Sequence, residues 1–210
     1  MKKKGFSGLE AFILIVILIG TYFYFFYESP GKTYEPGILV DKIPEQINLK
    51  GGKVIDHKGY TIITKAAVKV KARVLSKERY YFDDGADLIP VDLALGWKEM
   101  SDQSVIDELK IWQSGRFYYW KTRGNDFPVP RNKIEHNSSN WHMIPSTNQI
   151  EDELKSVSKG DVVSFEGFLV DVTKKGGSIR STSMVRTDTG PGACEIVFLV
   201  SFKVVDQSSE

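Results

Sequence analysis

The sequence predicts an α+β protein with one N-terminal transmembrane helix, followed by one mainly antiparallel β domain with a barrel-like sheet and two short helices. Three observations predict this class. An uncharged run covers residues 11–27, a period-2 pattern covers residues 60–75, and three apolar segments joined by turn residues follow residue 160. We expect a cytoplasmic tip and anchor over 1–28, a linker over 29–52 and an extracytoplasmic globular domain over 53–210.

The anchor prediction rests on the run AFILIVILIGTYFYFFY at residues 11–27. As a helix it would be about 25 Å long, near the lower limit for crossing a bilayer. Lys2, Lys3 and Lys4 precede the run and favour a cytoplasmic N-terminus. The run ends in bulky aromatic residues and Glu28, without the small residues of a cleavage site, so the alternative of a cleaved signal peptide is disfavoured.

The first half of the domain is expected to contain one clear strand. Prolines and glycines over 29–52 predict the linker, in which residues 38–40 can add an edge strand. Over residues 60–75, valine and alanine at even positions 68–74 alternate with lysine and arginine at the odd positions between them. This alternation is typical of a strand with one buried and one solvated face.

The middle of the chain is less regular. Residues 80–100 predict a structured loop with short turns, since acids, glycines and a proline interrupt the apolar pattern. Ser101 can cap a helix that carries its apolar residues through Trp112 and ends at Gly115. Residues 116–120 then predict a strand, and residues 127–145, with three prolines, an irregular loop.

The last part predicts a helix and three strands. Ser146 or Thr147 can cap a second helix, which Gly160 closes. Strands are expected over 161–172, 179–186 and 194–205, with a turn at 174–177 and a tight loop at 187–192.

Charge and cysteine content exclude some classes of function. Removing Lys2, Lys3 and Lys4 from the 28 basic residues leaves 25, and removing Glu10 and Glu28 from the 27 acidic residues also leaves 25. The part beyond the anchor is therefore neutral, and nucleic-acid binding is not expected. Cys194 is the single cysteine, so the domain has no intramolecular disulfide.

A cysteine hydrolase is one chemical hypothesis. Cys194 would be the nucleophile, His142 the base and Asp188 the acid that orients the histidine. Cys194 opens a predicted strand and not a helix, where a dipole would favour the thiolate, and this weakens the hypothesis. A serine version with Ser183 has less support, because no G-x-S-x-G motif surrounds that residue.

A ligand site is the other chemical hypothesis. Arg180, Arg186, Trp141 and Glu195 are the candidate ligand-binding residues, because arginine binds carboxylate or phosphate with two parallel hydrogen bonds. The simpler alternative is an internal salt bridge from an arginine to Asp188 or Glu195.

Metal and cofactor sites are not expected. His136, His142 and Glu135 match no compact zinc spacing, and Asp83, Asp84 and Asp87 do not match a calcium loop. No P-loop, dinucleotide-binding fingerprint or CxxC motif is present either. We therefore expect neither a metal nor a cofactor.

Several stretches resemble a family of bacterial single-anchor membrane proteins: ARVLSKERYYFDDGADLIPVDLALGW, SGRFYYW, HMIP and RTDTGPGACE. The resemblance covers most of the chain beyond the linker. It implies a bacterial envelope setting and carries over no activity and no site residues. With the anchor and the three lysines, we expect the bacterial inner membrane as the location, with the C-terminal domain outside the cytoplasm.

The sequence as a whole favours a non-enzymatic, membrane-anchored envelope protein. Residues 11–27 would contact the lipid bilayer, and the loops around His142, Arg186 and Cys194 would bind a membrane or envelope protein, or a small ligand. The alternative is an envelope hydrolase that uses Cys194 and His142.

Overall fold

The computed structural model describes residues 8–26, 31–174, 176–177 and 179–206, and it divides into two compact units, Met1–Pro30 and Gly31–Glu210. The first unit contains the helix α1, Gly8–Phe26, whose large apolar side chains at positions 9–22 are exposed. Within the described residues, no helix combines the length and the apolar character needed to cross a membrane.

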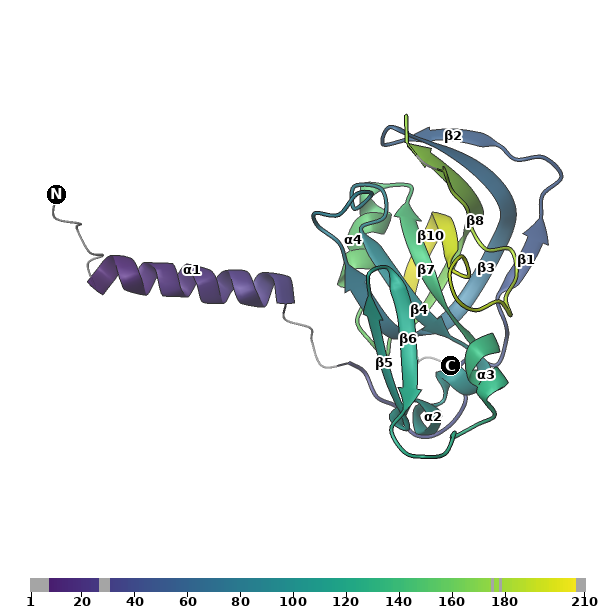
Figure 1. The fold of residues 1–210 in the computed structure, drawn as a ribbon, viewed down its shortest axis with the longest axis horizontal. Helices are drawn as coiled ribbons and strands as arrows, with labels where there is room; N and C mark the ends of the chain where they lie inside the picture. The colour runs from purple at the N-terminus through teal and green to yellow at the C-terminus, as the bar shows by residue number, and fades with distance from the viewer. Residues whose placement is uncertain (1–7, 27–30, 175, 178, 207–210) are drawn as a thin grey trace. The chain divides into compact units, whose positions relative to one another are not determined.

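The second unit is a mixed, mostly antiparallel α+β domain, which confirms the predicted class (Figure 1). Together with α1 the described chain has four α-helices and one 3-10 helix. The strands are β1 Glu45–Asn48, β2 Val54–His57, β3 Tyr60–Arg79, β4 Val91–Gly96, β5 Leu109–Ser114, β6 Phe117–Thr122, β7 Ser138–Pro145, β8 Val162–Lys174, β9 Ile179–Arg180 and β10 Glu195–Val205.

Five of these strands close into a barrel. β3 pairs with β4, β4 with β7, β7 with β10, β10 with β8, and β8 again with β3. Every pair is antiparallel except β7 with β10. This order is that of a five-stranded Greek-key barrel of the OB type, and helix α4, Asn148–Ser156, joins its third and fourth strands. The interior is filled by alternate apolar side chains, including Leu93, Trp141, Phe165 and Val197.

The predicted strand at 60–75 is confirmed and extends to Arg79 as β3. Its even positions 68–74 are buried, whereas Lys69 is exposed, as the alternation requires. Arg73 is the exception, with only 2% of its surface exposed. Its Nη1 donates to the carbonyl of Ser101 at 3.0 Å, and its guanidinium lies 4.9 Å from the ring centre of Tyr34. These contacts take the place of water around the buried guanidinium.

Two predictions for the middle of the chain are wrong. The loop expected over 80–100 contains β4, whose residues are buried throughout and so lack the alternation that identifies a half-buried strand. The helix expected from Ser101 is only α2, Gln103–Asp107, capped by Asp102, and the chain from Leu109 continues as β5.

The prediction of an irregular loop over 127–145 is also wrong. It contains helix α3, Arg131–His136, and the barrel strand β7. β7 is covered on both sides, so its residues SSNWHMIP show no period that distinguishes a strand from a loop.

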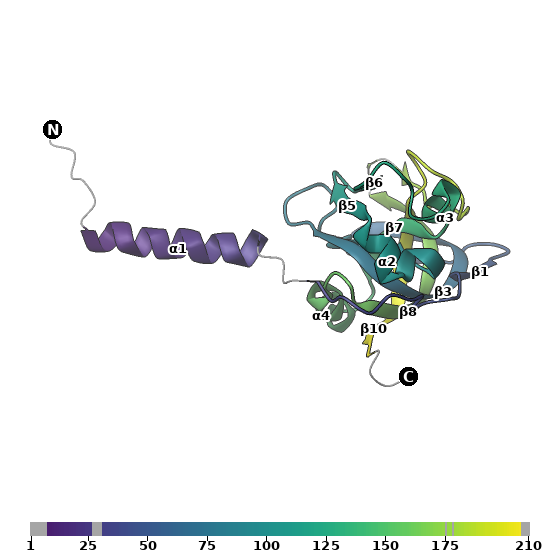
Figure 2. The ribbon, with the colours of Figure 1, turned by 90° about the horizontal axis from the view of Figure 1, so that it is seen from below.

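The C-terminal predictions are largely confirmed. The side chain of Thr147 caps α4 by accepting a 3.2 Å hydrogen bond from the backbone of Ile150. β8 and β10 match the first and third predicted strands, but the second is limited to β9 and continues as a loop up to β10. Figure 2 shows this loop, in yellow-green, beside α3.

Residues 31–44, part of the predicted linker, lie against the domain. The backbone of Val40 accepts a hydrogen bond from Lys98, at the start of the 3-10 helix Lys98–Ser101, at 2.6 Å, and donates to the Ser101 hydroxyl at 3.0 Å. The edge strand in this region is β1, not residues 38–40.

Candidate functional site

The site begins with two residues that face each other across β4 and β7. Asp92 and His142 are direct partners in this ladder, so their side chains leave the same face of the sheet. Val91 and Leu93 point into the barrel, and Asp92 between them therefore projects outward. Oδ1 of Asp92 lies 2.9 Å from Nδ1 of His142, an ion-pair distance for a protonated imidazole.

Asp92 is completely buried although it lies outside the barrel. The β5–β6 hairpin covers it, with Arg116 Nη1 3.4 Å from Asp92 Oδ1. The guanidinium of Arg116 also lies 3.8 Å from the ring centre of Tyr80 and donates to Asp83 at 2.7 Å. Burial and the neighbouring negative charge of Asp92 raise the pKa of Tyr80, which keeps the phenol neutral.

Arg116 reaches Asp92 because of the turn that carries it. Gly115 and Arg116 have φ values of +59° and +66°, the left-handed pair of a two-residue type I′ hairpin turn. Gly115 adopts this conformation without cost, whereas Arg116 is held in it by its several partners. The same turn directs the Arg116 carbonyl toward Cys194, whose sulfur lies 4.0 Å from it.

The histidine connects the buried acid with the cysteine. Cys194 directly precedes β10, whose first residue pairs with Trp141, so the thiol lies beside the middle of β7. Burial alone would lower the pKa of His142. The nearby Asp92 carboxylate and the half-buried sulfur of Cys194 outweigh burial and raise this pKa to about 9. At neutral pH the imidazole is therefore protonated, between the Asp92 carboxylate and the Cys194 sulfur.

Asn140 forms the other side of the cysteine's environment. Its Nδ2 lies 3.8 Å from the sulfur of Cys194 and donates to the Arg116 carbonyl at 3.1 Å. Its Oδ1 accepts from Gln113 of β5 at 2.7 Å. Because Gln113 donates to Oδ1, the NH2 group of the Asn140 side chain must face Cys194. An N–H donor is therefore directed at the sulfur.

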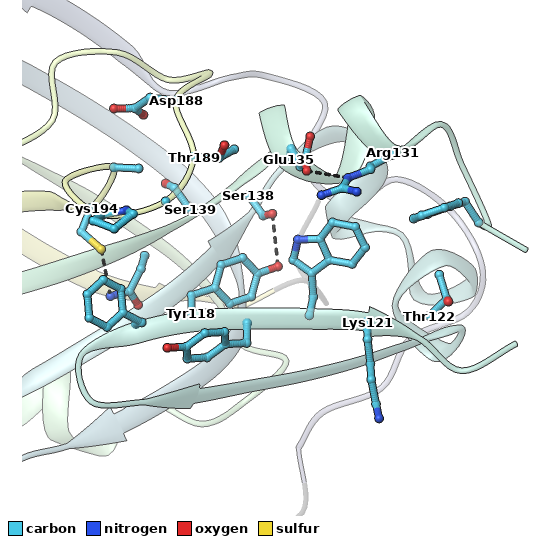
Figure 3. A pocket seen from close by; sticks show the side chains of 18 residues that line it. Tyr118, Lys121, Thr122, Arg131, Glu135, Ser138, Ser139, Asp188, Thr189 and Cys194 are labelled. Carbon is cyan, nitrogen blue, oxygen red and sulfur yellow. Dashed lines mark hydrogen bonds and ion pairs between the residues drawn. The ribbon is translucent and has the colours of Figure 1, made fainter. Parts of the chain in front are cut away.

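A pocket of about 680 Å³ opens beside Cys194. Figure 3 shows Cys194 at one end of it and Thr122 and Arg131 at the other, with Tyr118 reaching across to Ser138. The Tyr118 hydroxyl donates to Ser138 Oγ at 3.2 Å. The walls of the pocket are formed by strand β6, helix α3, the first residues of β7 and the loop before β10. The lining residues include Phe117, Tyr118, Trp120, Phe127, Asn140 and Asp188.

The predicted catalytic residues are placed in part as expected. Cys194 and His142 are adjacent, but the place beside the imidazole belongs to Asp92 and not to Asp188. Asp188 Oδ2 instead accepts a 2.7 Å hydrogen bond from Ser183, at the edge of the pocket. Sequence reasoning missed Asp92, although a single acid in the apolar run LIPVDLALG was a usable signal.

Three of the four predicted ligand-binding residues form an internal cluster. Arg186 makes an ion pair with Glu195, which is 1% exposed, and its guanidinium lies 4.7 Å from the ring centre of the buried Trp141. Arg186 also donates to Gln46 of β1 at 2.8 Å. Burial raises the pKa of Glu195 to about 7 although Arg186 opposes the rise. This arrangement corresponds to the alternative of an internal salt bridge.

Of the other predicted residues, Glu135 lines the pocket, whereas Arg180 and the acids of the 80–90 loop do not. Arg180 pairs with Asp84, at 3.7 Å, and Glu135 accepts from Arg131 at 2.8 Å. Asp83 and Asp87 bind different partners, so the three acids of the 80–90 loop do not converge. In the described part of the chain, no group of three histidine, cysteine or acidic side chains is arranged to hold a metal ion.

Comparison of the chain with family models, with curated proteins and with solved structures gives no match. Fold and site together define a Greek-key barrel that carries a buried acid and a histidine on the outer face of its second and third strands, with a cysteine beside them at the start of its last strand. In barrels of the OB type, this face and the loops beside it are where ligands bind.

Proposed function

We propose that this protein is a cysteine-dependent acyl-transfer enzyme, in its simplest form a hydrolase of amide, ester or thioester bonds. One observation carries the proposal: the buried carboxylate of Asp92 lies 2.9 Å from the His142 imidazole, and strand pairing places the only thiol of the chain, Cys194, beside the same part of β7. A nucleophile, a base and a third group that orients the base are the components of a covalent acyl-transfer site.

The roles follow from the contacts. Cys194 attacks the substrate carbonyl as a thiolate, beside the His142 imidazolium that stabilises its charge. The imidazolium then donates its proton to the leaving group as the carbon–leaving-group bond breaks, and a thioester with Cys194 remains. The now neutral imidazole removes a proton from water, which attacks the thioester and releases the acid and the Cys194 thiolate, so that the thiolate and the imidazolium are restored.

Asp92 and Asn140 support these steps without forming bonds to the substrate carbon. Asp92 holds the imidazole by Nδ1, which leaves the other nitrogen for proton transfer. The Asn140 amide, 3.8 Å from the sulfur, is placed to donate to the oxyanion that forms on the attacked carbonyl.

The test uses the fact that Cys194 is the only cysteine. Full-length protein in detergent is treated with iodoacetamide, and the rate of Cys194 alkylation is measured by mass spectrometry. We expect His142→Gln to slow alkylation and the hydrolysis of p-nitrophenyl acetate by about 100-fold or more, the scale of a lost acid–base group. His136→Gln is the matched control and should leave both rates unchanged.

Equal alkylation of the native protein and of the His142→Gln variant, at the rate of an unfolded thiol, would contradict the proposal. In that case ligand binding without turnover is the better account. The aromatic wall and the 680 Å³ volume of the pocket favour that second function. Partner or ligand capture that persists in Cys194→Ala would support it.

We further propose that residues 11–27 anchor the domain to the outer face of a bacterial inner membrane. Seventeen successive uncharged residues and three preceding lysines support this location. Tyr27 and the lysines lie outside the described residues. Such an anchor would hold the pocket near membrane-bound partners or substrates at high effective concentration.

The topology is tested by protease treatment of spheroplasts. We expect external protease to remove the domain and a membrane pellet washed with alkaline carbonate to retain the whole chain. Protection of the domain from external protease would reverse the orientation. Recovery in the soluble fraction would exclude the anchor.

A further inference from the structure

One edge of the β5–β6 hairpin has no strand partner in the described part of the chain. The two strands form their own sheet, and β6 pairs only with β5. The backbone of Arg123 donates to Glu108 at 2.8 Å, which fixes the alternation of the antiparallel ladder. Tyr118, Trp120 and Thr122 therefore direct their backbone N–H and C=O groups away from β5. Outside the ladder, no backbone hydrogen bond joins these three to another described residue.

This edge borders the pocket along its whole length. All six residues of β6 line the pocket. Successive side chains of a strand point to opposite faces, so a cavity on one face would contact only every second residue. A cavity that contacts all six residues of β6 must therefore run along the edge of the strand. Six residues at about 3.3 Å each give a groove roughly 20 Å long. Its opposite wall is formed by Ser138, Ser139 and Asn140, which precede the first residue of β7 that pairs with β10.

The groove leads to the nucleophile. The start of β6 follows Arg116, whose carbonyl lies 4.0 Å from the sulfur of Cys194, while its end at Thr122 lies at the far side of the pocket (Figure 3). Trp120 and Phe127 meet edge to face, 6.1 Å between ring centres, at the far part of the groove. A molecule seated along β6 would thus have one end at the thiol and apolar contacts further along.

We propose that the substrate is a polypeptide whose extended segment adds to β6 as a third strand, with its backbone paired to Tyr118, Trp120 and Thr122 and a carbonyl carbon at Cys194. This inference rests on the proposed acyl-transfer function and names its substrate class. An acyl chain or a flat aromatic ligand would cover the unpaired main-chain groups and remove them from water without bonding them, which is costly. A peptide backbone supplies alternating donors and acceptors with the matching spacing.

The alternation gives the proposal a specific test. The probe is the peptide acetyl-Ala-Val-Ala-Val-Phe carrying a C-terminal vinyl sulfone, which adds covalently to a thiol. Five further probes each carry one N-methyl group, on successive amides. We expect N-methylation at alternate amides to lower the rate of Cys194 labelling about tenfold, the effect of one lost hydrogen bond, and the amides between them to matter little.

A matched pair of variants tests the protein side. Thr122→Pro removes one outward N–H without removing a ladder bond to β5, whereas Thr122→Val keeps it, and both lose the hydroxyl bond to Gly124. Labelling by the pentapeptide probe should fall about tenfold in Thr122→Pro but not in Thr122→Val. Labelling by acetyl-Phe vinyl sulfone, too short to reach Thr122, should be unchanged in both.

The outcomes separate the two proposals. A His142-dependent, fast reaction of Cys194 with iodoacetamide but no alternation among the N-methyl probes would overturn strand addition and leave the cysteine chemistry intact. Faster turnover of a long-chain p-nitrophenyl ester than of a peptide ester, with no alternation, would overturn strand addition and identify an acyl chain as the occupant. A thiol that reacts with no probe would overturn both proposals.

Discussion

Asp92 shows how much a single buried side chain can determine. It is the only acid in β4, it is fully buried, and its charge is balanced by His142 and Arg116. Removing one cationic partner of a buried carboxylate strongly destabilises the folded protein, because the remaining charge is then not compensated. Asp92, His142 and Cys194 occur in this order along the chain because their strands do. The order itself carries no chemical meaning.

Replacing the acid should change the titration of the histidine. In Asp92→Asn the pKa of His142 should fall well below 9, because burial is then opposed only by Cys194. Nuclear magnetic resonance of the labelled imidazole in the full-length protein measures both values. Titration near 6.5 in the wild type and the variant alike would show that the carboxylate does not act on this ring.

The same shift predicts how stability depends on pH. His142 binds its proton more tightly in the folded protein than in the unfolded chain, so its stabilising effect is complete below about pH 6.5 and is lost as the pH rises through about 9. The difference corresponds to about 3 kcal/mol in the free energy of unfolding. Urea denaturation at pH 6.5 and pH 9.5 should show this loss in the wild type and a much smaller one in Asp92→Asn.

Among the elements, the β5–β6 hairpin contributes most to the site. Its tip delivers Arg116 to Asp92, its first strand delivers Gln113 to Asn140, and its second strand borders the pocket. It packs on the barrel through an outer apolar cluster that includes Leu109, Ala94 and Ile134. The hairpin therefore positions residues of the candidate site and does not merely cover the surface of the barrel.

Changing the turn should disturb both stability and reactivity. Gly115→Ala forces a side chain into a left-handed conformation, at a cost of about 1 kcal/mol in the free energy of unfolding. We also expect slower alkylation of Cys194, since the Arg116 carbonyl and guanidinium shift together. Gly124→Ala is the matched control, because a Cβ at Gly124 meets nothing within 4 Å. Equal urea midpoints for the two variants would contradict the turn assignment.

Sequence patterns identified β3 and α4, which each keep a solvated face, but missed β4 and β7, which are covered on both faces, and assigned β5 to a helix. β3 and α4 were predictable, because their periods of 2 and 3.6 residues survive in the sequence. β4 and β7 were not, and these two strands carry Asp92 and His142. Pairing Cys194 with His142 was possible from residue types, whereas choosing Asp92 over Asp188 required knowing the register of two strands that share no local signal.

At the scale of the whole molecule, the barrel depends on a close approach of β8 and β10. A Cβ at Gly167 would lie 2.3 Å from the carbonyl oxygen of Phe198, so only glycine fits this position. Gly167→Ala should lower the free energy of unfolding by about 2 kcal/mol through strain between the strands. It should also slow Cys194 alkylation, because β10 positions the thiol. An unchanged urea midpoint, equal to that of Gly124→Ala, would contradict this account.

The closure of the barrel has a consequence for when the thiol becomes reactive. Asp92 lies on the second barrel strand and His142 on the third, but Cys194 is placed only when the last strand, β10, inserts between β7 and β8. During synthesis the chain emerges with its N-terminus first, so the cysteine stays without an imidazole neighbour until the ring of strands is complete. If Cys194 is the nucleophile that we propose, its activation is thereby coupled to the insertion of the last barrel strand.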